Sequence, residues 1–201
     1  MEAARTPSKG RRDATEALLD AAERMLVSDG YAAITTRRVA AEAGVNHGLV
    51  HYYFGSMEEL LLQVLERFTG RLIARQREMY DADVPFIEKW RSAMAYLEDD
   101  YRAGYPKIWL ELQAMAWNRP EMRLRLLRVD DEWRSTLRKA FAPALRDYGL
   151  SEESFPLEGV LSLVMTFNKG IQLEQLCGIR AGHDELLAGI DDWLRDRESG
   201  R

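Results

Sequence analysis

The sequence has little cysteine and little histidine: Cys177 is its only cysteine among 201 residues, and there are three histidines. A single cysteine excludes an intramolecular disulfide, and so few ligand side chains do not favour a metal site. The longest nearly apolar runs, 60–65 and 160–167, are far shorter than the roughly 18 residues that a membrane span requires. With 46% hydrophobic and 30% charged residues, the composition is typical of a globular protein, and we expect it to be cytoplasmic, with no cofactor and no membrane partner.

The charge is unevenly distributed along the chain. The net charge of −5 taken alone argues against a nucleic-acid partner. However, residues 1–12 carry four basic residues and one acidic residue, whereas residues 13–55 carry three and six. A basic arm of this kind is consistent with contact to phosphate and equally with a terminus that is charged only to stay solvated.

Apolar residues recur at three- and four-residue spacing throughout the chain, and no stretch alternates over the length of a strand. This period predicts an all-α fold. Glycines, prolines and capping residues divide the pattern into nine helices. The predicted helices span residues 13–30, 35–43, 46–54, 56–80, 86–104, 108–117, 120–149, 157–177 and 184–195.

Two modules are predicted from this pattern. Ser56 and Glu59 form a capping box that opens the long amphipathic segment to about Tyr80, and we interpret this segment as the link between them. The first module is residues 1–56 and the second is residues 57–201.

The most informative region is residues 31–60, where two short predicted helices flank a glycine turn at Gly44. This spacing matches a helix-turn-helix DNA reader. Small residues such as Ala40 allow the two helices to cross closely, and Val50 and Phe54 can pack inward. The opposite face would present histidine and tyrosine side chains to the major groove. These outward residues are His47, Gly48, His51 and Tyr52.

The run TTRRVAAEAGVNHGLVHYYFGSMEELL resembles the DNA-binding signature of the tetracycline-repressor (TetR) family of bacterial regulators. The resemblance implies a homodimer that binds a near-palindromic operator and releases it when a small effector occupies the C-terminal module. Carried over position by position, it implies DNA contacts by nine residues. They are Thr35, Thr36, Arg37, Asn46, His47, Gly48, His51, Tyr52 and Tyr53.

The sequence departs from the family pattern at three positions. Members usually have tyrosine at the position of His51 and histidine at that of Tyr53, so the operator sequence does not follow from the resemblance. They often have lysine at the position of Met57, where a cation meets phosphate. The basic arm, residues 9–12, is a candidate to compensate by entering the minor groove.

The second module is predicted to hold the effector and to dimerise. All five tryptophans lie after residue 80, and large aromatic and methionine side chains can line an apolar pocket or equally form an ordinary helical core. The candidate ligand residues are Trp90, Met94, Tyr101, Trp109, Met115, Trp133, Phe167 and Asn168. The segment 157–177 is apolar around most of its circumference, which favours burial against a second copy. The candidate interface residues are Leu161, Val164, Met165, Leu173 and Leu176.

Other readings of these residues are weaker. His47 and His51 have the spacing of helical metal ligands, but Gly-Leu-Val between them lacks the glutamate of a zinc hydrolase. No phosphate loop or nucleophile motif indicates an enzyme, and Cys177 is given no role. The sequence therefore predicts a ligand-responsive, DNA-binding repressor of the nucleoid; the alternatives are an all-helical carrier of apolar ligands that no longer binds DNA and a small helical enzyme with an unmarked site.

Overall fold

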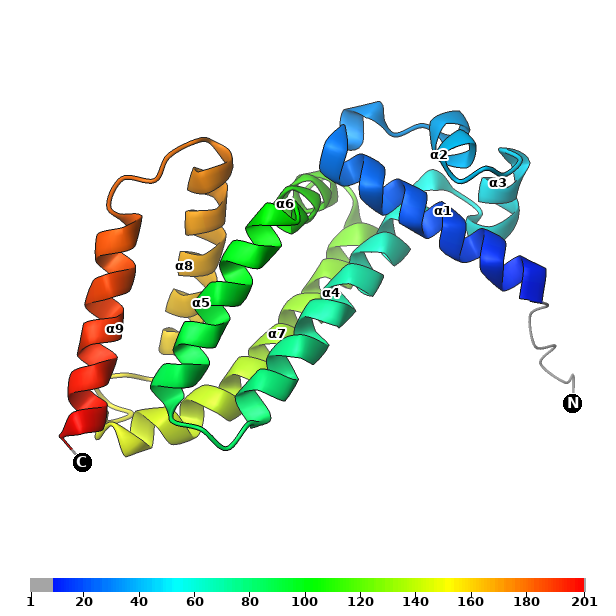
Figure 1. Ribbon diagram of the computed structural model, residues 1–201. Helices are drawn as coiled ribbons and strands as arrows, with labels where there is room; N and C mark the ends of the chain where they lie inside the picture. The colour runs from blue at the N-terminus through cyan, green and yellow to red at the C-terminus, as the bar shows by residue number, and fades with distance from the viewer. Residues whose placement is uncertain (1–8, 201) are drawn as a thin grey trace, which may run out of the picture. The chain divides into compact units, whose positions relative to one another are not determined.

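The computed structural model describes residues 9–200, except for the side chains of residues 9, 11 and 12, and these residues contain nine α-helices, one short 3-10 turn and no strand. The all-α prediction is therefore confirmed (Figure 1). The helices are α1 (Lys9–Ser28), α2 (Thr36–Glu42), α3 (Gly48–Phe54), α4 (Met57–Asp81), α5 (Phe86–Arg102), α6 (Tyr105–Ala116), α7 (Pro120–Asp147), α8 (Leu157–Leu176) and α9 (His183–Ser199), with the 3-10 turn η1 at Tyr31–Ala33.

Two helices begin earlier than the sequence predicted. Helix α1 begins at Lys9 and not at Asp13, so residues 9–12 form its first turn, while residues 1–8 of the predicted basic arm lie outside the described residues. Helix α6 begins at Tyr105 and not at Ile108. Pro106 is compatible with this start because a proline in the first helical turn lacks only an N–H group that would have no partner inside the helix.

The chain divides into two compact units. The first unit comprises the described residues up to Phe68 together with Lys107–Arg123, and the second comprises Thr69–Pro106 and the residues from Leu124 onward. This division falls within α4 and α7 and places α6 in the first unit. The functional division at residue 56 stays a prediction.

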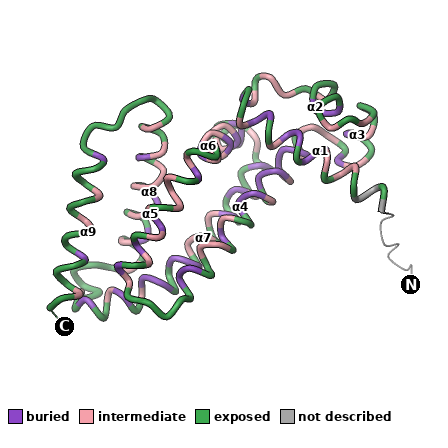
Figure 2. The backbone as a smooth tube through the Cα atoms, in the orientation of Figure 1, coloured by how far each residue is buried: buried purple, intermediate pink, exposed green. Residues whose placement is uncertain are grey.

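The first unit has its apolar core where α1, α2 and α3 meet the N-terminal half of α4 (Figure 2). Each helix contributes side chains at three- or four-residue spacing, the period that the sequence showed. Residues of this core with no exposed surface include Leu18, Leu26, Val39, Val50, Leu60 and Leu65. The short helices α2 and α3 are therefore packed against α1 and the N-terminal half of α4.

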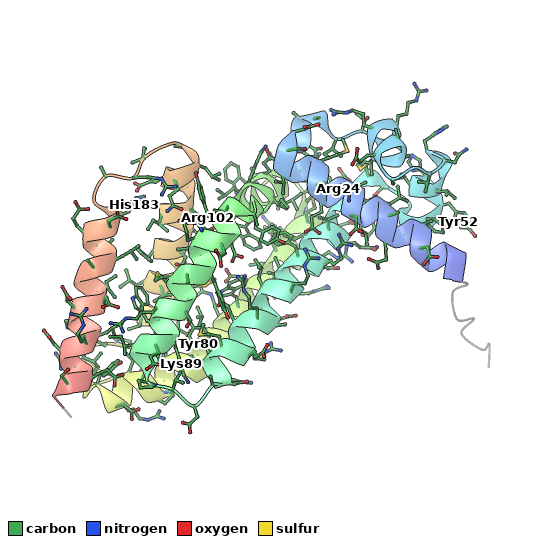
Figure 3. The ribbon with its side chains drawn as sticks, in the orientation of Figure 1. Arg24, Tyr52, Tyr80, Lys89, Arg102 and His183 are labelled. Carbon is green, nitrogen blue, oxygen red and sulfur yellow. The ribbon has the colours of Figure 1, made fainter. Side chains whose placement is uncertain are left out.

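The second unit has two neighbouring apolar clusters. One contains Tyr80, Leu137, Phe141 and Leu161, and Phe86 packs edge to face on Phe141 with ring centroids 4.9 Å apart. The carbonyl of Tyr80 accepts a hydrogen bond of 2.7 Å from Lys89, and burial raises the pKa of the Tyr80 hydroxyl (Figure 3). The other cluster joins α5, the end of α7 and α9, and it consists of Ile87, Trp90, Ala144, Tyr148 and Leu194.

A bidentate ion pair ties α9 to α5 in the second unit. Arg91 donates to both carboxylate oxygens of Asp191, at 2.6 and 2.9 Å, and Arg195 donates to Asp191 Oδ2 at 2.6 Å. The hydrogen bond from Arg91, with a further one from Arg195, lowers the pKa of Asp191 from 3.8 to about 2.

This pair predicts an acid sensitivity of α9. Because the folded-state pKa of Asp191 is lowered, its stabilising contribution is present above pH 3.8 and is lost as the pH falls towards about 2. We expect the amides of α9 to lose protection from hydrogen exchange over this interval before those of α4 do. In Asp191→Asn the protection of α9 should be lower at neutral pH and should change less on acidification; an unchanged acid response of α9 would contradict the assignment.

None of the helices within residues 9–200 combines the length and apolar character that crossing a membrane demands.

Candidate nucleic-acid interface

Helix α2 has a defined start and end. The backbone N–H of Arg38 donates to Thr35 Oγ1 at 3.3 Å, which is the N-cap bond expected from the threonine. At the other end Gly44 adopts a φ of 68°, and the N–H groups of Gly44 and Val45 donate to the carbonyls of Ala41 and Ala40. This is a Schellman ending, in which glycine takes a left-handed conformation that other residues rarely adopt. The predicted glycine turn therefore closes α2 and directs the chain into α3.

Helix α3 is one short segment between two local caps. Asn46 Oδ1 accepts a hydrogen bond of 2.8 Å from the N–H of Gly48, so the asparagine caps the start of α3 as the sequence predicted. Gly55 ends the helix with a φ of 75°, and its N–H donates to the carbonyl of His51 at 2.9 Å. Ser56 Oγ then accepts from the N–H of Glu59 at 3.0 Å and opens α4 without a longer loop.

The two faces of α3 differ sharply. Val50 and Phe54 are buried against the core of the first unit. His47, Gly48 and His51 are exposed, and Tyr52 is 69% exposed (Figure 3). This arrangement presents a row of polar side chains along a rigid helix of the width that the major groove of DNA accepts.

The other candidate DNA contacts lie around this face. Tyr53 and Thr36 are half-buried, whereas Thr35, Arg37 and Asn46 are exposed. The rings of Tyr52 and Tyr53 meet edge to face with centroids 5.0 Å apart. All nine candidates are on α2, on α3 or on the segments that cap them, and contact of each with DNA stays a prediction.

The two neighbouring arginines of α2 have different environments. Arg38 donates to Asp29 Oδ2 at 2.5 Å and to the Ala33 carbonyl at 3.0 Å. The hydrogen bond between Arg38 and the Asp29 carboxylate lowers the pKa of Asp29. Arg37 is exposed, and within the described part of the chain it makes no ion pair. Arg38 thus fastens α2 to the end of α1, while Arg37 is available for a phosphate or a base.

This difference predicts separate effects for the two substitutions. Arg37→Ala should weaken DNA binding and reduce the slope of log affinity against log salt by about 1, because one cation contact is lost. It should leave the thermal midpoint unchanged. Arg38→Ala, the matched control, should lower the midpoint slightly, since it removes an exposed ion pair. Equal salt slopes for wild type and Arg37→Ala, measured by fluorescence anisotropy, would exclude the phosphate contact.

Comparison with known proteins agrees with this geometry. Residues 18–64 match the family described as "Bacterial regulatory proteins, tetR family". The HTH-type transcriptional regulator BetI of Rhizobium meliloti is 42% identical over 57 residues, which cover 28% of each chain. A TetR-family transcriptional regulator from Rhodococcus sp. has the same fold, with a TM-score of 0.73 and 22% identity over 90% of this chain and 98% of that one. Residues 18–64 are therefore similar in sequence to the TetR family.

The similarity to curated HTH-type transcriptional regulators is local. The matched segments cover 28% of the length of BetI and 50% of that of an uncharacterized HTH-type regulator of Haemophilus influenzae. Solved structures extend the likeness of fold further: FadR of Bacillus subtilis, in complex with stearoyl-CoA, has a TM-score of 0.72 at 16% identity over 89% of this chain and 96% of that one. The sequence match to the family model thus covers residues 18–64, whereas the likeness of fold to FadR covers 89% of this chain.

The eight candidate effector residues are divided between the two units. Trp109 and Met115 lie on α6 in the first unit, and Met115 lines a cavity of about 440 Å³ together with Tyr31 and Glu111. The other six lie in the second unit, where most of them pack into the apolar clusters; they are Trp90, Met94, Tyr101, Trp133, Phe167 and Asn168. The structure therefore does not bring all eight residues into one compact unit.

Two polar atoms of α8 stand out among these residues. Asn168 Oδ1 and Gln175 Oε1 are buried, and neither has a hydrogen-bond partner among the residues that the structure describes. Tyr101 donates its hydroxyl to the backbone carbonyl of Gln175 at 3.2 Å. A buried acceptor without a donor costs free energy, so a ligand that offers hydrogen-bond donors would be stabilised here.

The prediction of the dimer interface is partly wrong. Leu161 has no exposed surface and Met165 is 7% exposed, because both pack into the core of their own unit. Val164 is half-buried against the same cluster. Leu173 and Leu176 are 51% and 41% exposed and stay candidates.

Sequence reasoning missed the large hydrophobic residue that α8 exposes most. Leu163 is 69% exposed, and it lies on an exposed stripe of α8 whose members repeat every three or four residues. The stripe consists of Gly159, Leu163, Thr166, Gly170 and Leu173. The sequence signal for this stripe was its small residues, Gly159 and Gly170. Small residues allow a second helix to approach closely, and this distinguishes the stripe from the side of α8 that faces the core.

A further contact set that the sequence did not indicate joins α6 to the end of α1 within the first unit. Glu111 Oε2 accepts a hydrogen bond of 2.7 Å from the N–H of Tyr31, and Lys107 donates to the Val27 carbonyl at 3.1 Å. Gly30 has a φ of 79°, which other residues rarely adopt, and a Cβ there would lie 2.8 Å from Glu111 Oε1, so a larger residue would displace this carboxylate. We refer to these contacts of Glu111 and Lys107 as the α6 clamp.

Within the described residues no group of three or more histidine, cysteine, aspartate or glutamate side chains has the arrangement of a metal site.

Proposed function

We propose that this chain is a ligand-responsive transcriptional regulator that acts as a repressor at a near-palindromic operator in the nucleoid. The observation that carries the proposal is the two-faced α3, which is fixed at both ends and exposes His47, His51 and Tyr52 along one side. Curated relatives of this chain are transcriptional regulators, and one from Mycobacterium tuberculosis is described as a repressor. None of those three side chains is used in the core, which supports a role in contact with another molecule.

A homodimer is the assembly that this proposal requires. Two copies related by a two-fold axis would place their α3 helices about 34 Å apart, one turn of DNA, and so would read two half-sites of one operator. The exposed stripe of α8 supports a second copy as the partner, because Leu163 and Leu173 there are large apolar side chains left in contact with water.

We infer that the effector is a small, largely apolar or aromatic molecule held mainly by the second unit. Among proteins of similar fold, FadR of Bacillus subtilis was solved with stearoyl-CoA and a regulator from Saccharomonospora viridis with choline. The unpaired acceptors of Asn168 and Gln175 would orient a ligand that carries a donor group. A ligand that binds better to the conformation unable to bridge both half-sites would lower operator affinity by its differential affinity for the two conformations.

The first test is selection of bound sequences from a random duplex library by the purified protein at moderate salt. We expect enrichment of a near-palindrome whose half-sites are one DNA turn apart. Absence of enrichment at every salt concentration would contradict the proposal and would favour the helical carrier of apolar ligands.

Two substitutions on α3 separate sequence reading from phosphate contact. His47→Ala should change the preferred bases in repeated selection, because an exposed imidazole at the start of α3 is expected to meet base edges. Tyr52→Ala should weaken binding to selected and random DNA by a similar factor, since a phosphate contact carries no sequence information. A uniform loss for His47→Ala, measured on both DNAs, would contradict the base-reading role.

A further inference from the structure

The ring of His51 is held by the peptide group of Gly55. Its Nδ1 lies 3.0 Å from the Gly55 carbonyl oxygen, while the Gly55 N–H donates to the His51 carbonyl at 2.9 Å. The positive φ of Gly55, 75°, allows the chain to turn here at the end of α3. The histidine and the glycine thus form two reciprocal hydrogen bonds within four residues.

This contact determines which ring nitrogen carries the proton. A carbonyl oxygen only accepts hydrogen bonds, so Nδ1 must be the N–H donor. In a neutral imidazole the other nitrogen is then an acceptor, and the hydrogen bond of one nitrogen sets the role of the other. Nε2 of His51 is therefore a hydrogen-bond acceptor in the neutral ring.

The acceptor belongs to an exposed side chain on the face of α3 that carries His47 and Tyr52. In the major groove, donors on base edges are the N4 amino group of cytosine and the N6 amino group of adenine, whereas guanine presents acceptors and thymine an acceptor and a methyl group. An acceptor in the major groove can therefore form a hydrogen bond with the amino group of adenine or cytosine, whereas guanine presents only acceptors, which repel it.

We propose that His51 is a specificity-determining residue that reads an exocyclic amino group, of adenine or cytosine, through Nε2. The proposal rests on the proposed DNA-binding function and deepens it, since it assigns the polarity of one base contact. Gly55 acts as the positioning residue, because its carbonyl fixes the tautomer before any DNA is bound.

The first experiment measures the tautomer directly. Long-range ¹H–¹⁵N spectra of the full chain, at a pH where the ring is neutral, should show His51 protonated at Nδ1 and unprotonated at Nε2. The His51→Ala variant assigns the resonances, because its spectrum lacks those of His51 and keeps those of His47 and His183. A proton on Nε2 in the free protein and in its DNA complex would overturn the proposal.

The second experiment tests whether His51 contacts an amino group of one operator base. Repeated selection with wild type and His51→Ala identifies the operator position whose preference depends on His51, and we expect adenine or cytosine there. Replacing that base by purine or 2-pyrimidinone, which lack the amino group, should weaken wild-type binding about tenfold, the effect of one hydrogen bond. The same replacement should leave the affinity of His51→Ala unchanged. A replacement outside the half-sites is the control for the duplex itself.

The outcomes separate this proposal from the proposed function. Guanine or thymine at the His51-dependent position, or equal losses for wild type and His51→Ala on removal of the amino group, would overturn the reading of an amino group while DNA binding stands. Failure of the wild type to select any sequence would overturn both. His51→Lys adds a positive test: its donor should shift the preference at that position to guanine.

Discussion

Replacing Leu163 by arginine is expected to convert the proposed dimer into a monomer. Leu163 is 69% exposed near the middle of the exposed stripe of α8, and in a two-fold interface each substitution would place two cations close together in an apolar contact. The desolvation of two unpaired charges exceeds what the remaining contacts of the interface supply. Operator affinity should fall by orders of magnitude, because each monomer keeps only one half-site.

Sedimentation equilibrium and DNA binding by the same preparations test this expectation. Leu127→Arg is the matched control, because Leu127 is 54% exposed on α7 and lies outside the exposed stripe of α8. It should leave the mass and the affinity as in wild type, and circular dichroism should show both variants folded. A dimeric Leu163→Arg protein would exclude the α8 stripe as the interface.

Replacing Phe54 by alanine is expected to cost about 3 to 5 kcal/mol of unfolding free energy, the range for loss of a buried phenylalanine. Phe54 is 6% exposed at the last turn of α3, where it holds that helix against the core of the first unit. The cavity left behind would loosen α3, so DNA binding should be lost together with the protection of its amides from hydrogen exchange.

Chemical denaturation of the Phe54→Ala variant measures this cost, and Tyr52→Ala is the control. Tyr52 lies two residues earlier on the same helix but is 69% exposed, so its truncation should change the unfolding free energy by no more than about 0.5 kcal/mol. Similar losses for the two variants would mean that α3 does not depend on the core below it for its position.

Local signals in the sequence predicted α2, α3 and the start of α4 well. Thr35, Asn46 and Ser56 each accept the capping hydrogen bond expected of them, and Gly44 and Gly55 adopt positive φ where a helix was expected to end. These bonds join residues two or three apart, so the information that specifies them lies within the segment itself.

The orientation of α8 and the α6 clamp were not predictable in the same way. Leu161 and Leu163 are both leucines on an apolar helix, and only the packing of α4, α5 and α7 decides which of them is buried. Glu111 and Tyr31 are 80 positions apart, and no spacing rule relates a carboxylate of one helix to a backbone N–H at the end of another. Tertiary contacts of this kind add information that periodicity does not contain.

The α6 clamp has a consequence for engineered sensors made by exchanging parts between regulators. The first unit is discontinuous in sequence, because Lys107–Arg123 returns to the helices before Phe68, and Glu111 satisfies a backbone N–H that begins a turn next to Gly30. A graft that takes only the N-terminal 68 residues would leave that N–H without its partner. A transferable DNA-binding part of this protein should therefore be cut as two segments, with α6 moving together with the helices that it holds.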